Sequence, residues 1–480
     1  MIWNEIEKKL EKHKDSFVKD GKVFCTYREI LDKTICLSNQ MQKHIKKGQK
    51  CVILCKWQIN EAIAILCCWK NGYIPVPLSV NYGNEHCKKI IDTVTADCII
   101  VDNDVLVCDW GYDYFNLQDC VYKTACKREK GTENDGYKFA LIMYTSGTTG
   151  SPKGAVLSEK AILNNVNGII QYFVMSDEDS ILISRPLYHC AVLIGEFLTA
   201  LFQGANIIFY SDLYNPFKVI ELMGKASVFC GTPTLLRQIS QIVKRNKGNN
   251  HVRMIAISGE CIKSKTAETI REAFPKSRIF NVYGLTEAGP RVSFLPSELF
   301  DKKPESVGRG LLNTSIQIRD DNNEILNNCE KGNIWVKSNS LMLLYYNNEE
   351  DTKNKLVNGW LNTGDVGYKD EDGDLYILGR SDDMIIKAGM NIYPKEIENY
   401  VDEIEGIKEC MAFPVEISDG ETKGIGLKVV CETDSLNSYE IMKEKICQCL
   451  PKYALPNKIE FVNELPKNIS GKMLRRIERL

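Results

Sequence analysis

The chain has 480 residues, more than one hydrophobic core usually holds, so we expect two or three domains. Its 61 lysine and arginine residues nearly balance 63 aspartate and glutamate residues, and a net charge of -2 argues against a nucleic-acid partner. The 19 cysteines are spread through apolar segments without a C-x-x-C pair. We therefore expect reduced core cysteines in a cytoplasmic protein, and neither a disulfide framework nor a zinc site.

The sequence gives no sign of export or of a membrane anchor. The first residues lack the basic-then-apolar order of a signal peptide. The apolar run 188–210 comes nearest to a membrane span, but His189, Glu196 and Gln203 interrupt it and Gly204 breaks it. We expect a buried helix and strand in this run, and no integral membrane segment.

The first third of the chain alternates between strand-like and helical patterns. Residues 22–27 and 50–55 have the composition of strands, and residues 61–70 form an amphipathic helical pattern that residues 73–77 end. A further strand is expected at 97–101. This alternation predicts parallel β-α units with helices on both sides of the sheet.

A segment rich in glycine and hydroxyl groups, residues 144–154, follows the apolar strand predicted at 139–143. Glycines let backbone N–H groups approach an anion, hydroxyls donate further hydrogen bonds, and Lys153 adds positive charge, which suits a polyphosphate. Pro152 before the lysine and Gly154 after it distinguish the segment from the usual P-loop. The alternative is a flexible loop without a ligand. The candidate phosphate-binding residues are Thr145, Ser146, Gly147, Thr148, Thr149, Gly150 and Lys153.

A predicted helix at 158–173 and a strand at 181–184 lead into the turn Pro186-Leu-Tyr-His189. A lone histidine is more often structural than functional. This histidine, however, would lie at the carboxyl end of a strand, where ligand crevices form in open α/β sheets.

The segment 280–289 combines three groups that an ATP site needs. Tyr283 offers an aromatic ring for a purine, Thr286 a hydroxyl for the α-phosphate, and Glu287 a carboxylate for Mg²⁺. The alternative is a strand and turn followed by a helix that Thr286 caps, and both interpretations can hold, since a helix start also binds anions.

These motifs resemble those of the adenylate-forming (ANL) superfamily, which contains acyl- and aryl-CoA synthetases, peptide-synthetase adenylation domains and luciferases. The match covers the loop 144–154, the Tyr-Gly-x-Thr-Glu segment from Tyr283, and Thr-Gly-Asp ending at Asp365. The resemblance implies an α/β fold: a large N-terminal domain of α/β sheets plus a small β subdomain, and a small mobile α+β C-terminal domain joined by a hinge. We expect the domains at 1–380 and 381–480, with the hinge at Asp382.

The resemblance also implies roles for individual residues. Asp365 would accept hydrogen bonds from both ribose hydroxyls, with Arg380 beside it, and the Gly-Glu turn ending at Glu260 would lie against the adenine. The implied nucleotide-binding set, beyond the phosphate loop, is Gly259, Glu260, Asn281, Tyr283, Gly284, Asp365 and Arg380. The implied catalytic residues are Lys472, His189 and Thr286, and the implied metal ligand is Glu287. The implied substrate and pantetheine pocket contains His189, Cys190, Ala191 and Gly389.

Two positions depart from the family pattern. Leu344 stands where the family usually has a structural glycine, so we expect local repacking without loss of activity. Ala388 precedes Gly389 where many CoA ligases have two glycines, which puts the pantetheine tunnel in question.

The resemblance implies that ATP and Mg²⁺ activate a small carboxylic acid as acyl-AMP, which then passes to the thiol of CoA. A free-standing enzyme that loads an acyl or peptidyl carrier protein is the alternative, and an ATP-binding protein without catalysis is a third. Ala191 stands about where amino-acid-activating relatives have an aspartate for the substrate ammonium. An α-amino acid is therefore disfavoured, and an aryl or fatty acid is expected.

Overall fold

The structure is a computed structural model, and it describes residues 1–103, 107, 110–124, 139–145, 152–246, 251–387, 390–416, 423–431, 436–451 and 454–466. Several predicted site residues lie outside the described residues, and their roles stay predictions. They are Ser146, Gly147, Thr148, Thr149, Gly150, Gly389 and Lys472.

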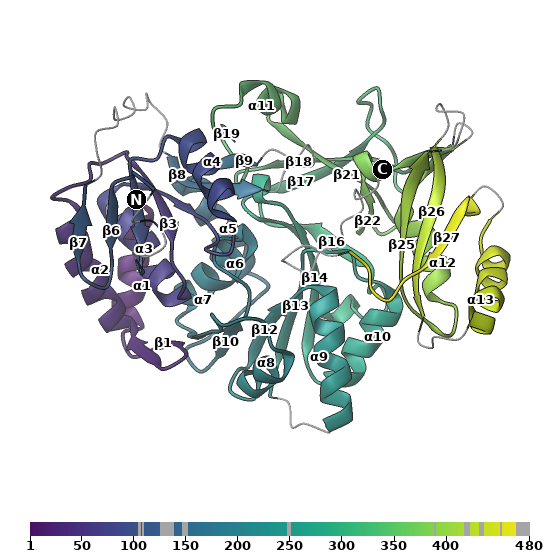
Figure 1. Cartoon of the computed structure of the whole chain (residues 1–480), viewed down its shortest axis with the longest axis horizontal. Coiled ribbons are helices and arrows are strands. Elements are labelled where there is room, and N and C mark those ends of the chain that lie inside the picture. Colours follow the sequence, from purple (N-terminus) through teal and green to yellow (C-terminus); the bar gives the residue numbers. More distant parts are fainter. Residues whose placement is uncertain are drawn as a thin grey trace.

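A five-stranded sheet of β-α units forms the N-terminal end of the molecule (Figure 1), as the alternating pattern predicted. Its order is β4-β3-β5-β6-β7, with the first four strands parallel and β7 antiparallel. Residues 73–77 were predicted only to end the preceding helix, but Ile74–Pro77 also forms strand β4. β4 pairs with β3 alone among the described strands, and prolines are tolerated on such an edge. The elements are β3 (Lys50–Leu54), α3 (Gln58–Asn71), β4, α4 (Asn84–Val94), β5 (Cys98–Val101), β6 (Tyr114–Asn116) and β7 (Val121–Lys123).

A second, larger sheet crosses the middle of the molecule. Its parallel half runs in the order β1-β11-β10-β12-β13-β14, with β2 antiparallel at the outer edge. The strands are β1 (Phe17–Asp20), β2 (Val23–Thr26), β10 (Ser180–Ile183), β11 (Asn206–Phe209), β12 (Val228–Gly231), β13 (Met254–Ile257) and β14 (Arg278–Gly284). The helices around it are α1 (Ile2–Lys12), α2 (Tyr27–Met41), α5 (Glu159–Ile170), α8 (Pro216–Met223), α9 (Pro233–Asn246) and α10 (Ser264–Ala273).

Alternate residues of these strands enter two separate cores, one on each face of the sheet. In β10, Ile181 and Ile183 belong to the core shared with α1, α2, α3 and α5, whereas Leu182 packs into the core under α8, α9 and α10. The side chains of a strand point alternately to the two faces, so a fully apolar strand is what a doubly covered sheet requires. In the five-stranded sheet of the first third, Ile53 packs into the core with α3 and Val52 into the core with α4, so the helices predicted on both sides of that sheet are confirmed.

The run 188–210 forms the buried helix and strand that its interruptions predicted. It contains α6 (Cys190–Val192), a π-helical turn η2 (Leu193–Leu198), α7 (Thr199–Gln203) and the strand β11. Among the residues that the structure describes, no helix combines the length and apolar character that crossing a bilayer requires. The described cysteines are free, and most of them are buried.

The strands of the β subdomain continue the large sheet by hydrogen bonds. β14 pairs antiparallel with β15, and the order then runs β16-β22-β21-β18-β17. The strands are β15 (Arg291–Leu295), β16 (Ser306–Gly310), β17 (Thr314–Arg319), β18 (Gly332–Ser338), β20 (Leu356–Val357), β21 (Trp360–Lys369) and β22 (Leu375–Arg380). The short helical turns are η3 (Thr286–Ala288), η4 (Ser297–Leu299) and η5 (Ser381–Asp383).

A small hairpin sheet carries the phosphate loop. β8 (Phe139–Thr145) pairs antiparallel with β9 (Lys153–Ser158), and β19 (Leu344–Tyr345) adds to the other edge of β9. Helix α11 (Glu349–Lys355) follows β19. The candidate loop therefore connects two paired strands.

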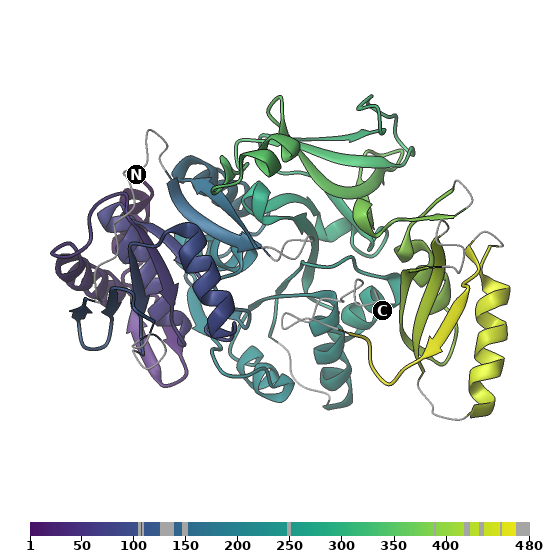
Figure 2. The ribbon, with the colours of Figure 1, turned by 45° about the horizontal axis from the view of Figure 1, so that its top comes forward.

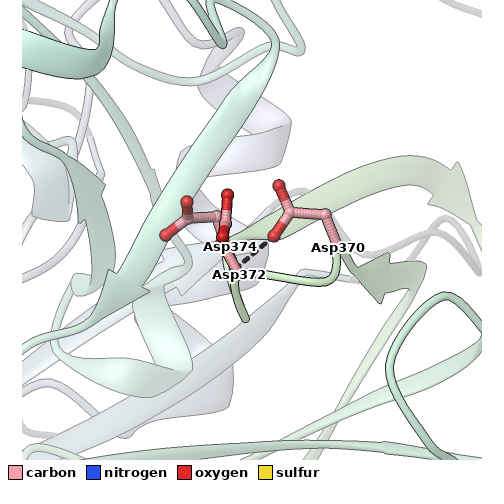
Figure 3. A group of neighbouring side chains, drawn as sticks. All are labelled: Asp370, Asp372 and Asp374. Atoms are coloured by element: carbon pink, nitrogen blue, oxygen red, sulfur yellow. Dashed lines mark hydrogen bonds between the residues drawn. The ribbon is translucent and has the colours of Figure 1, made fainter.

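Three carboxylates gather in the turn between β21 and β22, those of Asp370, Asp372 and Asp374 (Figure 3). Lys303 donates hydrogen bonds to all three, at 2.7, 2.6 and 2.8 Å. Arg309 adds a contact of 2.9 Å to Asp374. These hydrogen bonds and ion pairs to two cations fix the turn between β21 and β22.

The C-terminal part has its own sheet and core at the opposite end of the molecule (Figures 1 and 2). β25 pairs antiparallel with β26, and β27 joins β26 in parallel, with α12 and α13 beside them. Ion pairs Arg237–Glu409 and Lys263–Asp402 join it to α9 and to the segment before α10. The elements are β23 (Ile385–Lys387), β24 (Met390–Ile392), α12 (Pro394–Asp402), β25 (Ile407–Glu416), β26 (Lys423–Cys431), α13 (Leu436–Cys449) and β27 (Lys458–Phe461).

Candidate active site

Asp365 lies at the centre of a hydrogen-bond network where β14, β21 and β22 meet. The Tyr283 hydroxyl donates to its Oδ2 at 2.5 Å, and Arg380 Nη1 donates to its Oδ1 at 3.1 Å. Strand register explains the second contact, because Asp365 and Arg380 are direct partners in the β21–β22 ladder. Each carboxylate oxygen can accept a further hydrogen bond, so Asp365 can still take two vicinal hydroxyls.

Tyr283 remains a neutral phenol in this network. Burial raises the pKa of its hydroxyl, and the neighbouring Asp365 carboxylate raises that pKa further. A neutral phenol can donate to the carboxylate, which fixes the ring relative to the Thr-Gly-Asp turn. Its predicted stacking on a purine stays a prediction.

Glycine at position 284 permits a close approach of two chain segments. A Cβ there would lie 1.9 Å from the carbonyl oxygen of Pro290, and the β14–β15 pairing shifts register between Tyr283 and Gly284. Asn281, three residues earlier in β14, is buried and donates both amide hydrogens, to the carbonyls of Pro304 at 3.0 Å and Ser306 at 2.8 Å. These bonds anchor β14, and a nucleotide contact of Asn281 stays a prediction.

Thr286 does not cap a helix, contrary to the alternative interpretation of its motif. It is the first residue of the short turn Thr286–Ala288, and the residue before that turn, Leu285, makes no side-chain cap. The segment continues instead into β15, because the large sheet extends through antiparallel pairing. The hydroxyl of Thr286 is therefore not required for a helix start.

Glu287 has the properties of a single-carboxylate magnesium ligand. Its Oε1 accepts a hydrogen bond of 2.7 Å from the Tyr345 hydroxyl, and its backbone oxygen accepts one of 2.8 Å from Met342 N–H. Its Oε2 has no hydrogen bond to a described residue. Mg²⁺ usually binds one or two protein carboxylates together with phosphates and waters, so these residues fit the ion.

Lys153 lies at the end of the phosphate loop and reaches toward the Glu287 region. It faces Thr145 across the β8–β9 ladder, and the Thr145 hydroxyl donates to its carbonyl at 3.4 Å. Its ammonium lies 2.7 Å from an Asp351 carboxylate oxygen and 5.7 Å from the Tyr345 ring centroid. The base of the predicted phosphate loop and the candidate metal ligand are thus neighbours.

The Gly-Glu turn follows β13, between the ends of β12 and β14. Gly259 has φ +94°, a left-handed conformation that favours glycine. The Thr234 hydroxyl donates to Glu260 Oε2 at 2.8 Å. The turn is therefore built at the edge where the parallel strands end, which is where the sequence predicted a ligand crevice.

His189 and its neighbours lie at the carboxyl end of β10. Cys190 is buried, Ala191 is partly exposed, and the Glu287 carboxylate raises the pKa of the Cys190 thiol after the larger effect of burial. The predicted acid pocket and the candidate metal ligand are therefore within electrostatic reach of each other.

A charged cluster that the sequence did not reveal adjoins this turn. Arg185 forms an ion pair with the fully buried Glu196, and its Nη1 donates to Ser258 at 3.2 Å. Arg291 is 5% exposed, and its Nε has no hydrogen-bond partner among the described residues. A Cβ on Gly195 would lie 2.9 Å from Arg291 Nη2, which places this guanidinium against the segment that carries Glu196. Arg185 thus pairs with the Glu196 carboxylate, and the charge of Arg291 also acts on that carboxylate.

The His189 imidazole is expected to titrate near pH 4. Burial, and after it the Arg185 charge, lower its pKa from 6.5 to about 4. The folded state therefore favours the neutral ring. As the pH falls from 6.5 toward 4, protonation of His189 in the unfolded state should lower the free energy of unfolding. At pH 7 the ring should be neutral during catalysis. NMR titration of the histidine ring signals, with His189→Gln to assign the resonance, measures this pKa. A value of 6.5 or higher would contradict the structure.

The predicted hinge follows directly on the nucleotide residues. Asp382 is exposed in the turn Ser381–Asp383 after β22, and the Ser381 hydroxyl donates to the Gly364 carbonyl at 3.1 Å. Beyond it, Lys395 of α12 lies 3.8 Å from Glu305. The backbone therefore passes from the larger core to the C-terminal core next to the Thr-Gly-Asp turn. The hinge role itself stays a prediction.

The structure places the predicted residues Lys153 and Glu287 beside Tyr345, and the predicted residue Thr145 bonds to Lys153. It joins the predicted residues Tyr283, Asp365 and Arg380 in one hydrogen-bond network. Sequence reasoning missed Arg185, Glu196, Arg291, Tyr345, Asp351 and Lys355. One usable signal existed for the first two. An arginine just before the Pro-x-x-His turn and a glutamate inside an apolar run are both expected to be buried, and buried charged residues are rare unless they pair with each other.

Family models match both parts of the chain. The model described as AMP-binding enzyme matches residues 6–346, and that described as AMP-binding enzyme C-terminal domain matches residues 396–472. Among named relatives, a 2-succinylbenzoate–CoA ligase of Bacillus cereus is 26% identical over 457 residues, covering 94% of this chain and 92% of the relative. One from Bacillus anthracis is 26% identical over 458 residues, with the same coverage.

Solved structures share the fold over almost the whole chain. The o-succinylbenzoate CoA synthetase of Bacillus subtilis, in complex with its acyl-adenylate intermediate, has a TM-score of 0.85 at 23% identity, covering 98% of this chain and 97% of that one. The same enzyme with ATP and a magnesium ion has a TM-score of 0.84 at 23% identity, covering 98% of each chain. An amide bond synthetase of Marinactinospora thermotolerans has a TM-score of 0.86 at 20% identity, also covering 98% of each.

Proposed function

The chain belongs to the AMP-binding enzyme family, within the adenylate-forming superfamily, and on this premise we propose that it is an AMP-forming ligase. It activates a carboxylic acid with ATP as acyl-AMP and transfers the acyl group to the thiol of CoA. The observation that carries the proposal is the Asp365 network with Tyr283 and Arg380, placed beside Glu287 and Lys153.

The first half-reaction needs positioning more than covalent chemistry from the protein. A carboxylate acylates poorly because an oxide ion would have to leave, so its oxygen attacks the α-phosphorus of ATP and pyrophosphate departs. Asp365 and Arg380 hold the ribose, and Lys153 with the loop hydroxyls holds the phosphates. Mg²⁺, when bound at Glu287, supplies positive charge to the phosphates. Thr286 and Lys472 complete the proposed set at the α-phosphate.

The second half-reaction needs a thiol to reach the acyl carbonyl. The thiol attacks that carbon, the bond to the phosphate oxygen breaks, AMP leaves, and the thiol proton passes to solvent. We propose that residues 381–480 rotate about Asp382 against residues 1–380, which withdraws Lys472 and brings Gly389 to the pantetheine arm. The exposed position of Asp382 beside the Thr-Gly-Asp turn supports this hinge.

Two observations support a proposal for the substrate: the acid in the names of the relatives, and the charged side chains near His189. Relatives named 2-succinylbenzoate–CoA ligases favour an aromatic acid, and Ala191 still argues against an α-amino acid. We expected an apolar pocket, but charged side chains lie near it. The two positive charges of Arg185 and Arg291 exceed the single negative charge of Glu196. A buried cation in excess favours a substrate with a second anionic or polar group.

ATP–pyrophosphate exchange across a panel of acids tests this function. The panel contains benzoate, 2-succinylbenzoate, malonate, a medium-chain fatty acid and phenylalanine, and we expect the strongest exchange with 2-succinylbenzoate. Release of ADP and orthophosphate would refute the proposal. Supplying CoA or a phosphopantetheinyl carrier protein then decides between the ligase and a free-standing carrier-loading enzyme. Since ATP and CoA are cytoplasmic reactants, we propose that the enzyme acts in the cytoplasm.

A further inference from the structure

The last residue of α11, Lys355, places its ammonium beside the guanidinium of Arg380. Both groups border Gly364 in the Thr-Gly-Asp turn, where φ is +75°. A Cβ on Gly364 would lie 2.8 Å from Lys355 Nζ and 2.8 Å from Arg380 Nη2. Two cations therefore meet at one point of the nucleotide site.

The two cations differ in their partners. Arg380 has the Asp365 carboxylate, whereas Lys355 forms no hydrogen bond or ion pair with any described residue. Burial lowers the pKa of the Lys355 ammonium, and the Arg380 charge lowers it further. Glu287, Asp365 and Asp382 attract it from a distance without contacting it. An anion placed between the two cations would offset their repulsion and favour the charged form of Lys355.

Helix α11 also changes the charge of the phosphate loop. Asp351 lies four residues before Lys355, on the same face of the helix, and it pairs with Lys153 at 2.7 Å. The loop lysine is thus partly neutralised by α11. The same helix then presents a second ammonium to the site, at a position that has no carboxylate in contact.

We propose that Lys355 binds the 5′-phosphate of the adenine nucleotide, an assignment that rests on the proposed function. Lys355 lies beside Arg380 at the Thr-Gly-Asp turn, and the charge of the candidate metal ligand Glu287 also reaches its ammonium. The part of ATP that joins the ribose to the metal-bound phosphates is the α-phosphate, which remains in acyl-AMP and in AMP. Lys355 therefore holds the group at which acyl-AMP forms.

Calorimetric titration of the full chain with AMP and with adenosine tests this assignment. Lys355→Met keeps the side-chain length but removes the charge, and we expect it to weaken AMP binding by about 10- to 100-fold, the usual effect of losing a charged hydrogen bond. Adenosine lacks the phosphate, so its affinity should not change. Lys353→Met is the matched control, because Lys353 lies on the same helix and is 77% exposed.

Two results would overturn the role of Lys355: an AMP affinity like that of Lys353→Met, or equal losses for AMP and adenosine. Should Lys355→Met fail to bind adenosine because it does not fold, Lys355→Gln decides by the same comparison. Failure of the proposed function looks different, because the unmodified chain itself would then bind neither AMP nor adenosine.

Discussion

Replacing Asp365 with alanine is expected to lower ATP–pyrophosphate exchange by about 10²–10³-fold, since hydrogen bonds to a charged group contribute about 1.5–3 kcal/mol each and two ribose hydroxyls lose their acceptor. The same change leaves Arg380 without its carboxylate and Tyr283 without its acceptor. Most of the loss should appear as a higher KM for ATP. Steady-state exchange with varied ATP measures it.

Two further variants separate the ribose contacts from local disorder. Tyr283→Phe removes one hydrogen bond to Asp365 but keeps the ribose acceptor, so its loss should stay within about 10-fold. Asp32→Ala changes an exposed aspartate in α2 that pairs with Arg28, and it should not alter exchange. A KM for ATP within about threefold of the unmodified value in Asp365→Ala would remove Asp365 from the nucleotide site, since the two lost bonds alone predict more.

The sequence could predict the Asp365 site because its residues occur in short motifs. The motifs Thr-Gly-Asp and Tyr-Gly-x-Thr-Glu themselves contain the side chains predicted to contact the nucleotide. The register of the β21–β22 pair then places Asp365 opposite Arg380. Lys355 could not be found in this way. Its contact depends on how α11 and the turn at Gly364 fold against each other, and a lysine near the end of an exposed helix has no distinguishing pattern.

The extent of the large sheet shows a second limit. Local patterns predicted the parallel strands, because a strand buried on both faces is apolar throughout. The pairing of β14 with β15, and of β16 with β22, depends on contacts between distant segments and gave no local signal. The same extension replaces the expected helix after Thr286 with a short turn and a strand. The pairing of distant segments thus determines the secondary structure here, and local residue propensity does not predict it.

Exchange should also fall by about 10²–10³-fold when Glu287 is changed to glutamine, the range seen when one preorganised charge-stabilising group is removed. Glutamine keeps the size of the side chain and an oxygen that can accept from the Tyr345 hydroxyl, so the fold should persist. It removes the negative charge that a hard divalent cation needs. Exchange measured against Mg²⁺ concentration should therefore show a higher requirement for the ion as well as a lower maximum.

Tyr345→Phe is the matched control, because it removes the hydrogen bond to Glu287 Oε1 while leaving the carboxylate charge in place. If Glu287 acts through its charge, Tyr345→Phe should lose no more than about 10-fold, the usual range for one hydrogen bond, and should keep a nearly normal Mg²⁺ requirement. Equal losses in both variants, at an unchanged Mg²⁺ requirement, would mean that Glu287 only orients Tyr345. In that case the ring beside Lys153, and not the carboxylate, would be the group on which the phosphate site depends.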